Sequence, residues 1–408
     1  MPHQFTRRGL IKAGGAAMLG SVASPALLTS ALAGTVPDIT IYGTWEMTAP
    51  GIASTAALCD RGSRVAVENV ARKLNLNCRY ETIDTEGDPG KGVRKIDEQM
   101  SKSGAKFFVG GASSSVALAV SKAVNAAGGV YVTTGGADEL TGADCAKSTF
   151  RWPVATYGAV ETTVRPLRQK LPQAKRWYTL TPKYVFGDAL LRNTQRVLAG
   201  TGAEHVGNAY HTLAEREFSG YLTDALAAKP DVLCLHSFSG QTTDILRQAA
   251  EFGLKNKLAV LIVWSAGLDQ FKAMGPDLLE GVYLGAQYWH SIAEPANVET
   301  VKLFEKTFSS PPSYSEASGY TLARLILEGV AKAGTAEPAK VVAAMEGLRY
   351  DGLTGPEEVR AADHQCLKNY YLAIGKSSSK MKDPNDFIEI LSGGRAFLDP
   401  AKTGCVAI

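Results

Sequence analysis

Two glycine-rich turns carry residue types that can bind an anion. One is Gly110-Gly-Ala-Ser-Ser-Ser115 and the other is Thr133-Thr-Gly-Gly-Ala137. Each follows a predicted strand and leads toward a helix, whose free backbone N–H groups and dipole favour negative charge. Ser113 adds a hydroxyl donor, so the carboxylate of a small solute suits the two turns, whereas no lysine follows either turn as a phosphate-binding P-loop requires. The alternative is that both are tight strand-to-helix turns that hold no ligand.

Five aromatic residues lie at the same end of the predicted strands. Four follow strands and one precedes a long helix: Trp45, Phe186, Phe238, Trp264 and Tyr314. Aromatic walls with a few converging polar groups are the usual lining of a small-molecule pocket. Taken singly, each of these residues is more typical of a core position at a sheet end. Their recurrence at one end of two sheets favours the pocket.

Motifs for catalysis are weak. No predicted strand is followed by the G-x-G-x-x-G pattern of a dinucleotide site. Ser237-Phe-Ser239-Gly240 resembles a nucleophile elbow, but the leading glycine is missing and His236 stands directly before it. The six histidines show no paired spacing for a metal. The sequence therefore predicts a protein that is not an enzyme and needs no cofactor or metal.

Alternating strands and helices must position these residues. Short β-rich runs recur at a spacing of roughly 25 to 40 residues with helical patterns between them, which is typical of parallel sheets covered on both faces. One series runs from Ile39 to Thr133 and a second from Arg176 to Leu284, with a break near residues 151–157. Helices without strands between them follow at Asn297–Phe308, Ser315–Ala333 and Ala339–Glu346 and are expected to cover the first lobe, before a strand at Tyr370–Ile374 joins the second. The sequence predicts an α/β protein of two doubly wound lobes with several crossings between them.

Composition excludes several classes. The 408 residues are 45% hydrophobic and 20% charged, as in a folded protein of two or three domains. Three of the 43 basic residues lie in residues 1–33, which hold no acidic residue, so the remainder carries 40 basic and 40 acidic residues. Such a neutral body lacks the basic surface that nucleic acid requires.

The N-terminus has the pattern of an export signal. Thr6-Arg-Arg-Gly-Leu-Ile-Lys12 precedes an apolar stretch rich in alanine and glycine, and Ala31-Leu-Ala33 offers a cleavage site. Paired arginines of this kind are typical of the twin-arginine route, which predicts a periplasmic mature protein beginning at Gly34. The alternative is an N-terminal membrane anchor, which the cleavage site and the scarcity of leucine disfavour.

The six cysteines suit an oxidising compartment. Six cysteines allow fifteen pairings, so the sequence alone leaves the pairing open. Cys59 and Cys78 flank a helical segment, and their short separation favours a local bridge. Cys145 with Cys366 is a second candidate pair, and the pairing of Cys145, Cys366 and Cys405 stays open. Cys234, inside Val232-Leu-Cys-Leu235, is expected to be a buried thiol.

Several stretches together resemble the branched-chain amino acid binding proteins, the periplasmic type I receptors of ABC importers. The resemblance covers nearly the whole mature chain. It rests on the order and spacing of six stretches: Phe108–Ser115, Val132–Leu140, Thr149–Trp152, Tyr184–Asp188, Asp244–Ala249 and Ala362–Gln365.

The resemblance implies two Rossmann-like lobes joined by a three-crossover hinge, and no catalysis. The N-terminal lobe would comprise residues 34–155 and 288–360, and the C-terminal lobe residues 156–287 and 361–408. A membrane permease would be the protein partner. Cys59 and Cys78 are also placed like a disulfide of family members.

The resemblance also assigns roles at the cleft. The Ser113 hydroxyl and the backbone of the Gly135-Gly136-Ala137 turn would hold a solute carboxylate, with Phe186 and Phe238 as walls. Family members that bind amino acids place an acidic residue where this chain has Ala266. A buried ammonium without a partner costs several kcal/mol.

Two solute classes therefore stay open. Either Glu46, Asp269 or Glu316 replaces the missing acid and the solute is an amino acid, or the solute is an aromatic or short-chain organic acid. A ligand-sensing receptor domain on the same fold is a further alternative.

Overall fold

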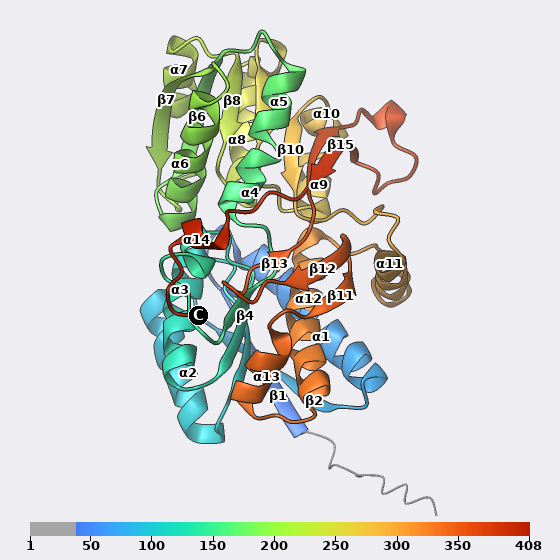
Figure 1. Ribbon diagram of the computed structural model, residues 1–408. Helices are drawn as coiled ribbons and strands as arrows, with labels where there is room; N and C mark the ends of the chain where they lie inside the picture. The colour runs from blue at the N-terminus through green and yellow to red at the C-terminus, as the bar shows by residue number, and fades with distance from the viewer. Residues whose placement is uncertain (1–37) are drawn as a thin grey trace, which may run out of the picture. The chain divides into compact units, whose positions relative to one another are not determined.

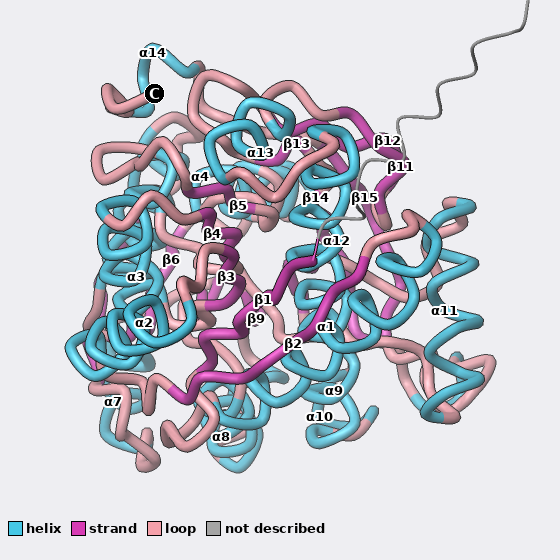
Figure 2. Tube along the Cα trace, turned by 90° about the horizontal axis from the view of Figure 1, so that it is seen from below, coloured by secondary structure: helices cyan, strands magenta, loops and turns pink. Residues whose placement is uncertain are grey.

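The structure, a computed structural model, describes residues 38–408, so the predicted export signal lies outside the described residues. The first sheet, in the lower half of Figure 1, has five parallel strands in the order β2-β1-β3-β4-β5, all of which are labelled in Figure 2. They are β1 (Asp38–Trp45), β2 (Asn77–Asp84), β3 (Phe107–Gly110), β4 (Val130–Thr133) and β5 (Thr149–Arg151). The strands predicted between Ile39 and Thr133 are thereby confirmed.

Both faces of this sheet are buried by helices. On one face lie α1 (Ala53–Lys73), α12 (Tyr314–Ala333) and α13 (Pro338–Met345), and on the other lie α2 (Pro89–Ser103) and α3 (Ser114–Ala126) (Figure 2). Successive residues of a strand point to opposite faces. Accordingly, Ile41 packs into the core beneath α1 and α12, whereas Tyr42 packs against α2 and α3.

Close packing of α1 against α12 depends on two glycines. A Cβ at Gly62 would lie 2.0 Å from the carbonyl oxygen of Glu316, and one at Gly319 would lie 1.8 Å from that of Cys59. Ser63 Oγ fills the crossing by donating to the carbonyls of Cys59 (3.1 Å) and Gly319 (3.0 Å). The crossing fixes the N-terminal ends of both helices beside the carboxyl ends of the strands.

The second sheet has seven strands in the order β15-β14-β10-β9-β8-β6-β7. Its parallel strands are β6 (Arg176–Pro182), β7 (Glu204–His211), β8 (Val232–Leu235), β9 (Ala259–Ile262) and β10 (Tyr283–Ala286). Two antiparallel strands, β14 (Tyr370–Gly375) and β15 (Ile388–Gly394), extend it beyond β10. The predicted addition of Tyr370–Ile374 to this sheet is confirmed.

Helices also bury both faces of the second sheet. One face packs against α4 (Thr156–Glu161), α5 (Val164–Lys170) and α6 (Val185–Ala199). The other packs against α7 (Ser219–Ala227), α8 (Gly240–Glu251), α9 (Leu268–Met274) and α10 (Pro276–Leu279). Single 3-10 turns occur at Asp138–Thr141, Leu254–Asn256 and Ser378–Lys380. The α/β fold of two doubly wound lobes is confirmed.

Three chain segments connect the sheets, as expected. The first joins β5 to α4, the second leaves β10, passes through α11 (Pro295–Phe308) and enters α12, and the third leads into β14. The third segment begins in a small antiparallel sheet of β11 (Arg349–Gly352), β12 (Gly355–Val359) and β13 (Cys366–Leu367), which the sequence did not predict. No helix among residues 38–408 is long and apolar enough to cross a membrane.

Buried hydrogen bonds tie the three connecting segments to one another. The Gln287 side chain accepts from the backbone N–H of Val154 (3.0 Å) and donates to its carbonyl (2.8 Å). Lys368 Nζ donates to the carbonyl of Gln287 (2.6 Å), and Gln365 Nε2 donates to that of Pro153 (2.9 Å). The crossings therefore form one linked hinge.

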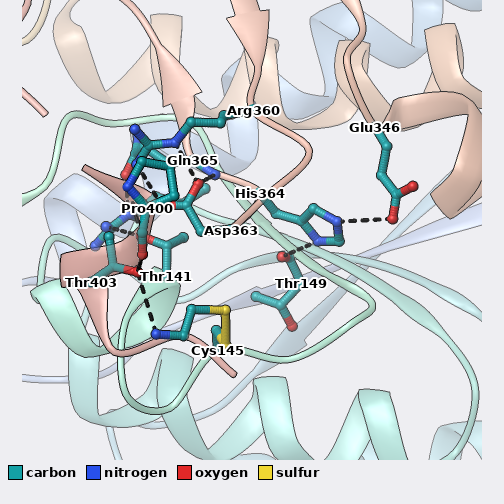
Figure 3. The surroundings of a disulfide bond; sticks show 12 residues. Thr141, Cys145, Thr149, Glu346, Arg360, Asp363, His364, Gln365, Pro400 and Thr403 are labelled. Atoms are coloured by element: carbon teal, nitrogen blue, oxygen red, sulfur yellow. Dashed lines mark hydrogen bonds and ion pairs between the residues drawn. A yellow bond between two sulfur atoms is a disulfide. The ribbon is translucent and has the colours of Figure 1, made fainter. Parts of the chain in front are cut away.

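The predicted disulfides are wrong. Cys145 is bonded to Cys405, which holds the last turn, α14 (Pro400–Thr403), against the segment after β4 (Figure 3). Cys59 and Cys78 are free because Cys59 lies near the carboxyl end of the first sheet, whereas Cys78 lies at the amino end of β2, paired with Ile39. Cys366 is a free, buried thiol beside Tyr350, and Cys234 is buried and free as predicted.

We predict that the protein unfolded without reductant exposes four thiols, and all six only after reduction. Replacing both Cys145 and Cys405 by serine should lower the free energy of unfolding by about 2–4 kcal/mol, because the bridge restricts the unfolded chain. Cys78→Ser is the matched control and should change it by less than about 1 kcal/mol. A bridge between Cys59 and Cys78 in a peptide map would contradict the structure.

Candidate ligand-binding site

The carboxyl ends of strands from both sheets face one cavity. The first lobe contributes Thr55, Cys59, Ala112, Thr134, Gly136 and Tyr314, and the second contributes Tyr184, Phe186, Phe238 and Trp264. The space open to the centres of water molecules is about 20 Å³. That is room for one or two water molecules. We call it the inner cavity.

A larger cavity opens beside it. Water centres can occupy about 240 Å³ there, and Tyr184 and Phe238 line both spaces. Its other residues again come from both lobes: Ala49, Pro50, Gly51, Ile52, Glu86, Gly87, Ser113, Pro182, Leu213, Ala214 and Gln241. We call it the outer cavity. Both linings are mainly apolar, so the two spaces differ in size rather than in polarity.

Aromatic rings nearly fill the inner cavity. Phe186 meets Trp264 edge-on with ring centroids 5.3 Å apart, and Tyr184 lies 5.8 Å from Phe186. A Cβ at Gly136 would lie 2.6 Å from the Phe186 ring and 3.0 Å from the Trp264 ring. Only glycine allows the turn after β4 to touch the rings of the second lobe this closely.

Hydroxyl groups supply the polar part of the lining. Thr134 Oγ1 lies 2.7 Å from Ser318 Oγ and 3.4 Å from Tyr314 Oη. Thr55 Oγ1 contacts Ser239 Oγ of the second lobe at 3.0 Å. The lining therefore offers hydroxyl donors and acceptors, and no lysine, arginine or histidine of the described part of the chain lines either cavity.

Five of the predicted site residues line the inner cavity, and a sixth lines the outer cavity alone. Phe186, Phe238, Trp264, Tyr314 and Gly136 belong to the first group, and Ser113 to the second. The other four predicted residues have partners inside the lobes. Trp45 Nε1 donates to Tyr80 (2.8 Å), Gly135 N–H to Thr133 Oγ1 (3.0 Å), Ala137 N–H to Ser114 Oγ (3.2 Å) and Ala266 N–H to Gln270 Oε1 (2.7 Å).

The backbone donors expected to hold an anion are already engaged. Glu46 accepts the N–H of Ala112 (3.2 Å) and of Ser113 (3.1 Å), so a carboxylate of the protein itself lies at the N-terminus of α3. Ser114 Oγ accepts the N–H of Gly136 at 3.2 Å. The Ser113 hydroxyl has no hydrogen-bond partner among the described residues and lines the outer cavity, where its predicted role remains to be tested.

Five residues that line the inner cavity were not predicted, and one of them, Ala112, directly precedes the predicted Ser113. Tyr184 and Thr134 stand beside predicted positions, so the neighbouring signals at Phe186 and Thr133–Ala137 could have indicated them. Thr55 and Cys59 are four residues apart on α1 and therefore share a helix face. Nothing in the local sequence separates them from ordinary core residues.

The serine–histidine motif does not form an exposed catalytic site. His236 lies between the hydroxyls of Thr181 and Thr194 (3.0 Å each), and burial lowers its pKa to about 3. Ser237 Oγ contacts His211 Nε2 at 2.7 Å, but the Ser237 side chain is fully buried. The described residues contain no group of three or more metal-ligating side chains placed to hold a metal ion.

A third space lies away from the strand ends. It is an open groove of about 610 Å³ between α1, α11, α12 and the β11–β12 hairpin. Four of its six charged side chains are paired, Lys73 with Glu299 and Arg324 with Glu328. Elements of the first lobe and the segment leading to it line the groove. Closure of the two lobes would therefore not enclose a solute bound there.

Comparison with known proteins decides the family. The model of a family described as periplasmic binding protein matches residues 39–380. The chain belongs to the periplasmic binding protein family. Members bind small molecules, act as solute-binding proteins rather than enzymes, and work with the permeases of ABC transporters.

Relatives of this periplasmic binding protein differ in what they bind. An amino acid ABC transporter substrate-binding protein from Pseudomonas fluorescens Pf-5 is 51% identical, with 91% of this chain and 99% of that chain covered and a TM-score of 0.87. A Leu/Ile/Val-binding protein of Rhizobium johnstonii is 24% identical over 75% of this chain and 82% of its own. A solute-binding protein from R. palustris in complex with benzoate shares the fold, with 20% identity, coverage of 91% and 99%, and a TM-score of 0.78.

Glu46 is a buried acid beside the inner cavity of this periplasmic binding protein, and it forms no ion pair with any described residue. Glu46 has no exposed surface, and its charged neighbour Asp84 is also an acid. Burial raises the pKa of Glu46 to about 7, although the N–H groups of Ser113 and Ala112 oppose the shift. Near neutral pH this carboxyl therefore holds a proton in part of the molecules.

We predict that Glu46 makes the solute-free protein less stable as the pH rises. The folded form titrates near pH 7 and the unfolded form near pH 4.5, so between these values the folded form binds more protons and stability falls with increasing pH. The drop in unfolding free energy from pH 5 to pH 8 should be larger in the wild type than in Glu46→Gln by about 1–3 kcal/mol. Equal drops in urea titrations would contradict the assignment.

Proposed function

We propose that this protein is the solute-binding component of an ABC importer and that it captures a small carboxylate-bearing solute. The observation that carries the proposal is the inner cavity, which residues of both lobes line at the carboxyl ends of their strands. In open α/β sheets this is the edge where ligands bind. Export by the twin-arginine signal in residues 1–33 would place the protein in the periplasm, where the importer collects its solute.

Binding would act by closure of the lobes. We assign residues 34–155 and 288–360 to one lobe and residues 156–287 and 361–408 to the other. Thr55 with Ser239, and Gly136 with Phe186 and Trp264, are contacts between lobes. A solute held on both sides favours the closed form, because only that form makes both sets of contacts. The permease would then recognise the closed form.

The lining supports a carboxylate solute with an apolar part. The hydroxyls of Ser113, Thr134 and Tyr314 would meet the carboxylate, and Phe186, Phe238 and Trp264 would pack against the apolar part. A branched-chain type amino acid fits the names of the amino acid binding relatives. An aromatic or short-chain organic acid is the second candidate, favoured by the aromatic walls and by the benzoate bound to a protein of the same fold.

We predict that a thermal-shift screen of amino acids and organic acids finds a solute that stabilises the protein. At a concentration one hundred times Kd, the free energy of unfolding should rise by about 2.7 kcal/mol. For a micromolar solute the binding free energy is about −8 kcal/mol. Small-angle scattering should show a smaller radius of gyration with the solute than without it. Binding without any change in the radius would contradict closure.

We predict that Ser113→Ala weakens a carboxylate solute by about 10- to 100-fold, because a hydroxyl donating to a charged group contributes about 1.5–3 kcal/mol. Calorimetric titration measures the change. Ser115→Ala is the matched control, since this serine lies two residues further along α3 and lines neither cavity. Equal affinities of the two variants for the solute would show that the Ser113 hydroxyl does not bind the solute.

A further inference from the structure

Three acidic residues were candidates to replace the acid missing at Ala266, and the structure separates them. Glu316 pairs with Arg61 and accepts the backbone N–H of Ser313 (2.8 Å) at the start of α12. Asp269 is exposed on α9. Glu46 is fully buried and forms no ion pair with any described residue. Of the three, only Glu46 is buried without a positively charged partner among the described residues.

An ionised carboxylate without a cation is costly inside a protein. The two backbone N–H groups on Glu46 reduce that cost, but each oxygen accepts only one of them. A carboxylate has about four acceptor positions, so acceptor capacity is left on both oxygens. This remaining capacity suits an N–H donor that carries a positive charge.

Glu46 lies beside the inner cavity. Its partner Ala112 lines that cavity. Burial and then the charge of Glu46 raise the pKa of the Cys59 thiol and of the Tyr184 hydroxyl. Cys59 and Tyr184 line the cavity from opposite lobes, so the field of this carboxylate reaches both of its sides.

We propose that Glu46 is a specificity-determining residue that receives the ammonium group of the solute, so that the solute is an amino acid rather than a plain organic acid. This inference rests on the proposed function. The solute carboxylate would stay with the hydroxyls of Ser113, Thr134 and Tyr314, as proposed above, while the ammonium takes the acceptor positions that Ala112 and Ser113 leave free on Glu46. The acid that binds the ammonium therefore lies in the first lobe, at the N-terminus of α3. No acidic residue is then needed at position 266 in the second lobe, where this chain has Ala266.

Four titratable groups face Glu46 from the elements packed around it. They are Asp84 on β2, Cys59 on α1, Tyr131 on β4 and Tyr184 before α6. Burial raises the pKa of Cys59, Tyr131 and Tyr184, so these three stay neutral near pH 7. None of the four is a cation, so the solute would supply the first positive charge at this site.

The test compares each amino acid with the same molecule lacking its amino group. Leucine is paired with 4-methylpentanoate and phenylalanine with 3-phenylpropanoate, and calorimetry gives both affinities. The wild type should bind the amino member of at least one pair ten times more tightly or better. Glu46→Gln should weaken that amino acid 30- to 100-fold and leave the paired acid within threefold. Glu98→Gln on the exposed face of α2 is the matched control and should change neither.

The pH dependence tests the same claim without a variant. Below the pKa of Glu46, affinity for the amino acid should fall about tenfold per pH unit, because the ammonium needs the ionised carboxylate. Affinity for the paired acid should stay level or rise. A merely structural Glu46 would give both members the same pH profile.

The possible outcomes are distinguishable. If organic acids bind and the amino group adds nothing, the role of Glu46 is refuted while solute capture stands. Equal losses for both members of a pair in Glu46→Gln would likewise refute it. If no member of any pair stabilises the wild type, the proposed function itself fails and the inference with it.

Discussion

The contact between the turn after β4 and two aromatic rings is the constraint on which the cleft depends. Gly136 lies against Phe186 and Trp264 because it has no side chain, and any Cβ there would overlap the rings. This contact brings the carboxyl ends of the two sheets together. It also leaves the inner cavity small, so a solute larger than a few atoms must displace rings or extend into the outer cavity.

Electrostatics add a second constraint. The N-terminus of α3, where a strand-to-helix turn usually offers free donors to an anion, is occupied by Glu46. Arg151 is also buried, and it donates to the carbonyl of Gly136 and to the side chain of Gln365. Its guanidinium group is therefore bonded within the hinge and does not line the cavity. The cleft consequently has a buried acid, several hydroxyls and no lining cation from residues 38–408.

Much of the fold could be predicted from the sequence. The alternation of strands and helices, the two lobes and the aromatic positions follow from patterns within one or two elements, as Phe186, Phe238, Trp264 and Tyr314 show. The errors involve contacts between distant segments. The Cys145–Cys405 disulfide requires the C-terminal end of the chain to return to the segment after β4. The hydrogen bond from Ser113 N–H requires the Glu46 carboxyl to lie at the N-terminus of α3. Neither contact leaves a local signal.

A crystal structure with the tightest solute from the screen tests the central claim most directly. The account predicts one molecule in the cleft, touching Thr134 or Tyr314 on one lobe and Phe186 or Trp264 on the other. A solute bound instead in the groove between α1 and α11, with the cleft still filled by the rings, would contradict it.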